Sequence, residues 1–242
     1  MDLEIRPLTA RSIVLSTLLG IHPPRLPARN LVRVGELFGI AEGTVRVALS
    51  RMVAAGELIQ AAGTYTLSDR LLARQARQDE SRRPPGARWD GTWEIAVITA
   101  DRRPAADRAA LRQAMSALRL AELREGTWLR PANLNRSRPG IVTRQCAFLL
   151  GRPEQEPEAL AASLWDLDAW TAKAHALRDA LAEATAIVDR FTLAAAVLRH
   201  LLDDPLLPPA LLPASWPGPE LRAAYERVER DFAELLAVHV PS

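Results

Sequence analysis

The sequence predicts an α+β protein, mixed over about its first 150 residues and helical after that. Three observations lead to this class. Helical patterns followed by two short strand-like runs occupy residues 9–67, a strand, helix, strand, strand order occupies residues 92–150, and four helical segments follow Gly151. With 242 residues, 48% of them hydrophobic, the chain can bury more than one core.

The first 56 residues contain the patterns of three helices. Thr9 or Ser12 can cap the first helix, and the prolines between residues 23 and 27 separate it from a second helix over residues 28–38. Gly39 is placed to end the second helix in a left-handed conformation. The third helix is predicted to begin at Ala41 and to end near Gly56.

The two sides of the third helix differ in chemistry. Helical spacing puts four apolar side chains on one side, namely Val45, Ala48, Leu49 and Met52. The opposite side carries small groups flanked by longer donors, namely Gly43, Val47 and Ser50 beside Thr44, Arg46 and Arg51. Small groups allow close approach to DNA while arginines reach phosphates and base edges, so this pattern is typical of a recognition helix.

Two strand-like runs, residues 58–61 and 64–67, flank Ala62-Gly63, where glycine permits the positive φ of a tight turn. Three helices and a hairpin in this order predict an N-terminal winged helix-turn-helix that binds double-stranded DNA. The predicted DNA contacts are Arg29, Gly43, Thr44, Arg46, Val47, Ser50, Arg51 and Thr64. The alternative is an ordinary helical hairpin whose arginines are only solvated.

Charge is distributed unevenly along the chain, which the net charge of +2 conceals. Residues 1–83 carry 12 arginines and 8 acidic residues, and residues 84–150 carry 11 arginines and 6 acidic residues. Residues 151–242 carry 8 basic and 15 acidic residues. A polyanion is therefore attracted by the first two segments and repelled by the last, whose acidic faces suit solubility or a protein partner.

The predicted domains follow from these patterns. They are a winged helix-turn-helix DNA-binding domain over residues 1–74, a linker over 75–88, a central domain over 89–155 and a helical C-terminal domain over 156–242. The linker has almost nothing to bury and follows a helix-like segment over residues 68–74.

The elements expected in the central domain are strands over 92–99, 126–130 and 141–150, with a helix over 105–120 after the first. The expected C-terminal helices are 158–165, 168–183, 191–202 and 219–238, with a proline-rich crossing before the last.

Five short segments follow one another along the chain in a specific order, although each segment alone is a weak indication of a family. They are Gly39-Ile40 with Val45-Arg46 and Ala48-Leu49-Ser50-Arg51; Trp89-Asp90-Gly91-Thr92-Trp93; Gly126-Thr127-Trp128-Leu129-Arg130-Pro131-Ala132-Asn133-Leu134; Leu164-Trp165-Asp166-Leu167; and residues 199–209 with Leu211-Leu212-Pro213 and Trp216-Pro217-Gly218. Together they resemble the PaaX family of transcriptional regulators over nearly the whole chain.

The resemblance implies a winged helix, a central ferredoxin-like domain similar to the Cas2 fold, and a helical C-terminal domain. The best-known member of the family represses phenylacetate degradation genes and is released by phenylacetyl-coenzyme A. By this resemblance we expect a repressor of a catabolic operon that binds operator DNA and is released by a small effector such as an acyl- or aryl-coenzyme A thioester. We expect a cytoplasmic protein that needs no cofactor and does not enter a membrane.

Homodimerisation is expected on physical grounds as well. One helix reads only a few base pairs, so two copies should engage inverted half-sites about one helical turn, or a multiple of it, apart. The leucine-rich, acidic C-terminal region is the expected place for dimer contacts.

Two departures from the family pattern bear on these expectations. Wings of the family commonly contain a basic, tyrosine-rich hairpin, whereas residues 61–65 have no basic residue and one tyrosine. An arginine-isoleucine-tyrosine-like segment usually precedes the central domain, whereas residues 81–85 read Ser-Arg-Arg-Pro-Pro. Wing contacts and the linker can therefore differ from those of relatives.

The predicted effector site rests on the needs of a coenzyme A thioester, which are cations for its phosphates and an apolar slot for its acyl end. The candidate residues are Trp128, Arg130, Asn133, Arg136, Arg138 and Trp165, and Trp170 and Trp216 are further candidates for the slot. The alternative is that the tryptophans pack domains and the arginines are solvated loop residues.

An enzyme is the alternative class. The Cas2 resemblance makes a metal-dependent nuclease the competing interpretation, with Asp101 as its metal ligand, although Asp101 also suits a turn at the end of a strand. Cys146 fits a packed thiol better than a nucleophile, and the four histidines lack ligand spacing. No glycine-rich phosphate loop occurs. We therefore predict no catalytic residue and no metal site.

A third class is a DNA-binding structural or activator protein without a ligand.

Overall fold

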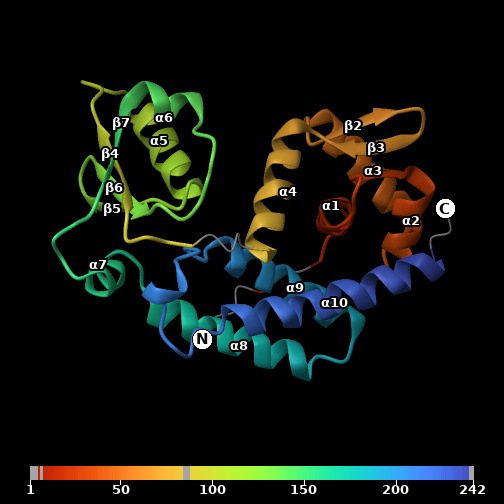
Figure 1. The fold of residues 1–242 in the computed structure, drawn as a ribbon. Coiled ribbons are helices and arrows are strands. Elements are labelled where there is room, and N and C mark those ends of the chain that lie inside the picture. The colour runs from red at the N-terminus through yellow and green to blue at the C-terminus, as the bar shows by residue number, and fades with distance from the viewer. Residues whose placement is uncertain (1–4, 6–7, 84–87, 240–242) are drawn as a thin grey trace. The chain divides into compact units, whose positions relative to one another are not determined.

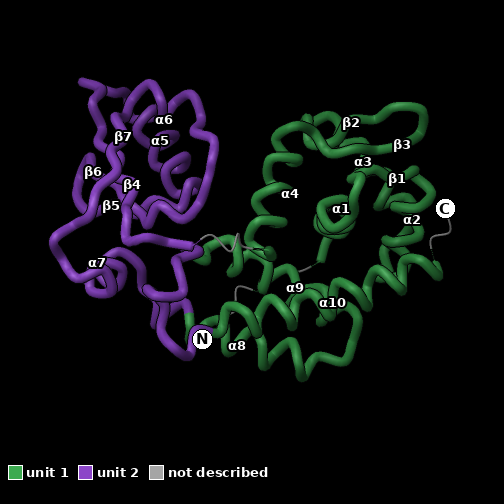
Figure 2. The backbone as a smooth tube through the Cα atoms, viewed as in Figure 1, with its two compact units in different colours: residues 1–83, 171–204, 217–242 green, residues 84–170, 205–216 purple. Residues whose placement is uncertain are grey.

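The computed structural model describes residues 5, 8–83 and 88–239. The chain forms two compact units, drawn in green and purple in Figure 2. Unit 1 combines the ranges 1–83, 171–204 and 217–242, and unit 2 combines the ranges 84–170 and 205–216. Each unit is described by itself below.

The elements are labelled in chain order (Figure 1). They are α1 Ala10–Gly20, β1 Arg25–Pro27, α2 Ala28–Leu37, α3 Glu42–Ala54, β2 Leu58–Ala61, β3 Thr64–Leu67, α4 Asp69–Arg82, β4 Trp93–Ile98, α5 Ala105–Ala117, β5 Ala121–Arg124, β6 Thr127–Pro131, α6 Gly140–Gln145, β7 Cys146–Gly151, α7 Pro157–Leu164, α8 Leu167–Glu183, α9 Ile187–Leu202, the short 3₁₀ helix η1 Pro209–Leu211 and α10 Gly218–His239. Helices and two antiparallel sheets thus confirm the predicted α+β class.

Helix α1 begins at a reciprocal cap that uses both residues proposed from the sequence. The Thr9 hydroxyl accepts from the Ser12 backbone N–H, and the Ser12 hydroxyl accepts from the Thr9 backbone N–H. This arrangement satisfies donors that the first helical turn leaves open. The apolar residues of α1, including Val14 and Leu18, are buried against α3 and the small sheet of unit 1.

Helices α2 and α3 are joined by a tight turn at Gly39. The Gly39 N–H donates to the Glu36 carbonyl and the Ile40 N–H donates to the Gly35 carbonyl, while Gly39 has φ of 71°. These two bonds with a left-handed glycine form a Schellman motif, which ends α2 and redirects the chain into α3.

A close approach between α2 and α3 fixes their packing. A Cβ atom added to Gly35 would overlap Cγ2 of Val45, whose side chain is fully buried. Glycine at position 35 therefore lets Val45 seat against the α2 backbone, and this contact sets how α3 is presented.

The hairpin β2–β3 turns through Ala62 and Gly63, both of which have positive φ, at 48° and 75°. Because Ala61 pairs directly with Thr64, the loop has two residues and fits a type I′ turn. Strand β1 pairs with the other edge of β3, which completes a three-stranded antiparallel sheet in the order β1-β3-β2.

An ion pair joins α1 to the turn that follows α3. Arg11 Nε donates to Glu57 Oε2 at 2.9 Å, and a second guanidinium nitrogen contacts Glu57 Oε1. The hydrogen bond from Arg11 holds the pKa of the Glu57 carboxyl below its usual range, against the opposing effect of burial.

Helix α4 extends into the segment interpreted as a linker. Gln75, which is buried, donates through Nε2 to the carbonyls of Leu19 and Ile21 at 3.0 Å each. This side chain satisfies the carboxyl end of α1, so the helix continues to Arg82 although its sequence has few apolar residues. Residues 84–87, also assigned to the linker, lie outside the described part.

The last helices of the chain pack in unit 1 beside the N-terminal elements. Phe38 at the end of α2 contacts Phe191 of α9 and Phe232 of α10, with ring centroids 4.8 and 5.9 Å apart. Arg82 forms ion pairs with Asp79 on α4 and with Glu229 on α10. The N-terminal and C-terminal domains predicted as separate therefore contribute to one compact unit, while the three-domain division itself stays a prediction.

Unit 2 is built on a four-stranded antiparallel sheet in the order β5-β6-β4-β7. Its chain order of β4, α5, β5, β6, α6 and β7 is the split βαβ arrangement of ferredoxin-like domains. Alternation along the strands buries both faces: Ala96 and Trp128 pack with α5 and α6, and Trp93 and Leu129 pack with α7 and η1.

The structure corrects one expected element and adds two strands that had not been expected. Residues 141–145 were expected to start a strand but lie in α6, where Val142 is buried against α5, and β7 begins only at Cys146. A β-branched, apolar segment such as Ile141-Val142 reads as strand locally, but its tertiary packing decides otherwise. Strands β1 and β5 had not been expected; each is short and lies at the edge of its sheet.

Within the described ranges, none of the helices is both long and apolar enough to cross a lipid bilayer.

The contact at Gly35 gives a first prediction. We expect Gly35→Ala to destabilise the protein by about 1–3 kcal/mol, the usual cost of overpacking, because the new methyl group displaces Val45. Adding Val45→Ala removes the overlapping methyl group, so the double variant should lose less stability than the two single losses added together. Urea unfolding of all four proteins measures this; strictly additive losses would contradict the contact.

The Arg11–Glu57 pair gives a prediction of pH dependence. Because the folded-state pKa of Glu57 is lowered, its contribution to stability is present above its unfolded pKa and is lost as pH falls through the folded value. Arg11→Met should cost about 0.2–1 kcal/mol at pH 7, since the Arg11 side chain is 55% exposed and screened. Unfolding free energies measured from pH 7 to pH 3 should converge for the two proteins; a constant gap would refute the assignment.

Candidate nucleic-acid interface

Helix α3 presents a polar, sterically open face to solvent. Its anchoring side chains Val45, Leu49 and Met52 are each at most 2% exposed. The residues predicted to contact DNA from this helix are all exposed, namely Gly43, Thr44, Arg46, Val47, Ser50 and Arg51. The structure therefore brings these six predicted residues together on one accessible helix, held by a buried apolar face.

Val47 is the unusual member of this face because it is apolar and 51% exposed. Water does not stabilise an exposed valine side chain. Its methyl groups can, however, pack on the methyl group of thymine in the major groove. Ala41 is the N-cap, so α3 begins at Glu42, one residue later than the sequence predicts.

The two remaining predicted contacts lie on neighbouring elements. Arg29 is exposed in the first turn of α2. Thr64 is half-buried at the start of β3, where it pairs with Ala61 on one side and with Pro27 on the other. Two further exposed arginines not singled out from the sequence, Arg25 on β1 and Arg33 on α2, belong to the same unit.

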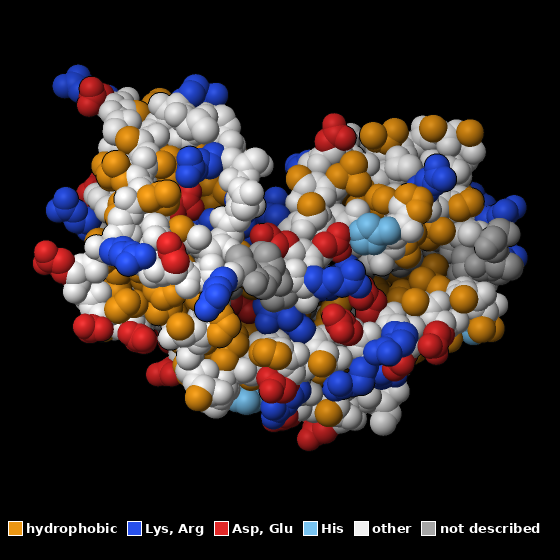
Figure 3. All heavy atoms as spheres, in the orientation of Figure 1, with side chains coloured by type: hydrophobic (Ala, Val, Ile, Leu, Met, Phe, Trp, Pro, Cys, Tyr) orange, Lys and Arg blue, Asp and Glu red, His pale blue; other side chains and the backbone are white. Residues whose placement is uncertain are grey.

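The hairpin tip lacks cations. Ala61, Ala62 and Gly63 are exposed, and Ile59 on β2 is 54% exposed. Small hydrophobic side chains accordingly cover the region of β2 and β3 in Figure 3. Any contact of this hairpin with a nucleic acid must therefore use backbone groups, small side chains or Gln60 and Thr64 rather than salt bridges to phosphates.

Sequence reasoning missed Glu42, which lies at the start of α3 and binds one of the candidate arginines. Arg46 Nε donates to Glu42 Oε1 at 2.6 Å, and both side chains are more than half exposed. The spacing of four residues on a helix was the available signal. The negative charge of the Glu42 carboxylate stabilises the N-terminus of α3, but the carboxylate also competes with a phosphate for Arg46.

Comparison with known proteins identifies the family. The description "PaaX-like protein" matches residues 9–71, "PaaX protein central Cas2-like domain" matches residues 86–145, and "PaaX-like protein C-terminal domain" matches residues 158–241. The chain belongs to the PaaX-like family. The three matched regions follow the order that the sequence motifs predict, and they cover most of the chain.

A solved structure with high similarity is "Uncharacterized protein Rv0674 from Mycobacterium tuberculosis". It is 49% identical to this PaaX-like chain, with a TM-score of 0.81, over 96% of this chain and 98% of that one. Among curated proteins, none matches the chain.

The arginines predicted for an effector in this PaaX-like protein already have partners within unit 2. Arg130 is 3% exposed and its Nε donates to Glu94 Oε2 at 2.9 Å. Arg138 donates to Glu94 Oε1 at 2.6 Å and lies over the Phe148 ring, 3.6 Å from its centroid. Arg136 donates to the Ala117 carbonyl. Glu94, on β4, thus binds two of the three arginines.

The other candidates are separated by the sheet of unit 2. Trp128 is buried in the core with α5, whereas Trp165 packs on the opposite face, where its ring stacks near Trp93 with centroids 6.5 Å apart. Asn133 donates to the Leu206 carbonyl at 2.8 Å. The six residues therefore do not line one cavity wall, and their role in effector binding stays a prediction.

The structure also shows where the residues considered for catalysis lie. Asp101 is exposed in the loop between β4 and α5, and the described residues contain no group of three or more His, Cys, Asp or Glu side chains arranged to hold a metal ion. Cys146 is buried at the start of β7, and burial raises the pKa of its thiol, which disfavours the reactive thiolate.

The exposed face of α3 gives a testable prediction. Arg46→Ala or Arg51→Ala should weaken DNA binding by about 1–3 kcal/mol if the side chain reads a base, or reduce the salt dependence by about one unit if it contacts a phosphate. Glu42→Gln should strengthen binding by about 0.2–1 kcal/mol, the usual value of an exposed ion pair, because Arg46 is released.

Fluorescence anisotropy with a labelled duplex, titrated at several salt concentrations, measures these effects. The matched control is Arg178→Ala, which removes an arginine on α8 that pairs with Asp179. If Arg178→Ala weakened binding as much as Arg46→Ala, net charge rather than α3 would be responsible.

Proposed function

We propose that this PaaX-like protein is a DNA-binding transcriptional regulator whose residues 9–67 act as a winged helix-turn-helix. The observation that carries the proposal is α3: a helix anchored by three fully buried side chains displays small residues and two arginines on its open side. The preceding turn at Gly39 and the following hairpin β2–β3 supply the remaining parts of this motif.

In the proposed complex, α3 lies in the major groove. Gly43 and Ser50 allow the helix to approach the base edges, and Arg46 and Arg51 flank it as donors to phosphates or guanines. The uncharged hairpin then adds no salt bridges, so α3 and the arginines of β1 and α2 carry most of the electrostatic attraction.

The proposed biological role is repression of a catabolic operon, relieved by an acyl- or aryl-coenzyme A thioester. Membership in a family known for transcriptional regulators supports this role. A thioester releases the protein only if it binds the DNA-free conformation more tightly than the DNA-bound one, and operator DNA must then weaken thioester binding by the same factor.

Two copies are proposed to bind one operator, because a single α3 reads too few base pairs for selectivity in a genome. The operator is then an inverted repeat whose half-sites lie about one helical turn, or a multiple of it, apart. Sedimentation of the free protein and footprinting of its complex report the two halves of this proposal separately.

The test begins with selection of bound fragments from genomic DNA, followed by titration of the selected duplex with and without effectors. We expect retardation without cleavage in the presence of Mg²⁺, and a thioester should weaken binding by about 5- to 150-fold while the free acid does little. Cleavage that Asp101→Asn abolishes would instead support a nuclease. Tight, selective binding that no thioester alters would leave a DNA-binding protein and remove this effector class.

A further inference from the structure

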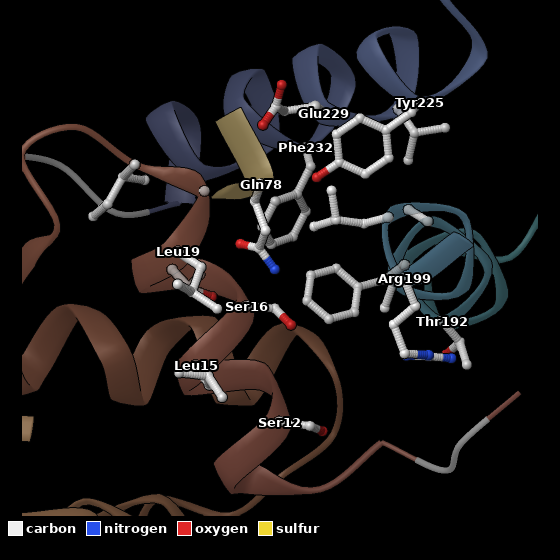
Figure 4. A pocket seen from close by; sticks show the side chains of 18 of the residues that line it. Ser12, Leu15, Ser16, Leu19, Gln78, Thr192, Arg199, Tyr225, Glu229 and Phe232 are labelled. Carbon is white, nitrogen blue, oxygen red and sulfur yellow. The ribbon is translucent and has the colours of Figure 1, made fainter. Parts of the chain in front are cut away.

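Unit 1 contains a cavity of about 390 Å³ between α1, α4, α9 and α10. This volume lies within the range of about 300–1,000 Å³ that small-molecule sites occupy. The cavity lies in a different unit from Trp128, Arg130 and the other effector candidates taken from the sequence motifs. Figure 4 shows that side chains of α1 line one side and those of α9 and α10 line the other.

The greater part of the wall is apolar. Leu15 and Leu19 of α1 face aromatic residues from the C-terminal helices, including Phe191, Tyr225 and Phe232. Phe191 and Phe232 also contact each other, with ring centroids 5.1 Å apart. Such rings provide flat surfaces on which an aromatic or acyl group can pack.

A buried acceptor of the wall has no partner. Gln78 on α4 is 3% exposed, and its Oε1 receives no hydrogen bond from the described chain. Figure 4 shows its amide between Ser16 and Leu19 of α1 and the aromatic side chains of α10. A buried amide oxygen without a donor is unfavourable, so the Gln78 amide gains free energy if it turns its oxygen toward a ligand that donates a hydrogen bond.

Cations gather at the same cavity. Arg74 of α4, Arg199 of α9 and Arg11 of α1 all line it. Burial lowers the pKa of Arg74, and the charges of Arg11, Arg77 and Arg199 lower it further. No hydrogen bond or ion pair from the described residues engages the Arg74 guanidinium. Two carboxylates lie nearby, but Glu57 is bound by Arg11 and Glu229 by Arg82.

We propose that this cavity binds an organic anion with an apolar body, whose carboxylate, sulfonate or phosphate is held by Arg74 together with Arg199. The apolar body packs among Leu15, Phe191 and Phe232, and a donor group of the ligand satisfies Gln78 Oε1. Arg74 is half-buried among other arginines and forms no hydrogen bond or ion pair with the described residues, and Glu57 acts on it only through its charge, so an anion bound at Arg74 is stabilised.

The location suggests how such a ligand acts on DNA binding, and this one step rests on the proposed function. Helix α1 lines the cavity with one side and shares the core of Val45, Leu49 and Met52 with α3 on the other. A ligand that favours one position of α1 therefore favours one presentation of α3.

The binding step is tested without DNA. The probe is 1-anilinonaphthalene-8-sulfonate, which joins an aromatic body, an N–H donor and an anion, and its match is N-phenyl-1-naphthylamine, which lacks the sulfonate. We expect both to bind the native full-length protein at one saturable site. Arg74→Gln should weaken the sulfonate about tenfold or more, the value of a charge-assisted hydrogen bond, and should leave the neutral probe within about twofold.

Three variants make the test specific. Arg77→Gln is the matched control, because Arg77 is exposed on the same helix and does not line the cavity. It should change neither affinity by more than about twofold. Ser16→Phe places a ring in the cavity from α1 and should weaken both probes. Arg199→Gln should weaken binding of the sulfonate as Arg74→Gln does. It is the variant to use if thermal unfolding shows that Arg74→Gln does not fold.

The outcomes separate the site from the regulatory role. Absence of a saturable site in the folded protein, equal loss with Arg77→Gln, or sulfonate binding unaffected by both Arg74→Gln and Arg199→Gln would overturn the proposed site. If the probe pattern holds and the sulfonate also weakens operator binding in wild type but not in Arg74→Gln, the coupling is supported. If the probe pattern holds in a protein that binds no DNA, the proposed function fails while the anion site stands.

Discussion

The presentation of α3 depends on one close contact, the seating of Val45 against the backbone of α2 at Gly35. With any larger residue at position 35 either the Val45 side chain or the two helices must shift, because the buried Cγ2 of Val45 lies where a Cβ atom would come. The Schellman motif at Gly39 fixes the turn between the same helices, so position and direction of α3 are set by two glycines that act for different reasons. The side chains that face outward, such as Arg46, can then vary without disturbing the fold.

Helix α1 extends this constraint to the C-terminal part of the chain. One side of α1 contributes Val14 and Leu18 to the core that holds α3, and its other side lines a cavity closed by α9 and α10. In the proposed coupling, a helix with a core on one side and a partly apolar, partly cationic cavity on the other links the two, because packed cores respond to displacement by moving between discrete arrangements. The three-phenylalanine cluster around Phe191 strengthens this by tying the end of α2 to the same two C-terminal helices.

Local sequence patterns anticipated most elements of unit 1 because its helices begin and end at strong signals, such as the Thr9 cap and the glycine at position 39. They failed where a long-range contact decides the conformation. Residues 141–145 carry strand-like side chains but form a helix over the core of unit 2, and Gln75 extends α4 by binding carbonyls more than 50 residues away in the chain. Neither the packing of Val142 nor the partners of Gln75 can be read from neighbouring residues.

The same limit applies to the arginines, which dominate the cations of this chain. Composition and motif favoured Arg130 and Arg138 as anion ligands, yet both bind Glu94, which lies 36 or more residues away and compensates one of their two positive charges. Arg74, which no motif singled out, is half-buried among other arginines at the wall of a cavity. Whether an arginine can hold a ligand is decided by which carboxylates reach it in the folded chain, because a guanidinium already paired gains little from a second anion. The sequence therefore indicates where arginines are abundant. The fold determines which of these arginines no carboxylate binds directly, and such arginines can hold an anionic ligand.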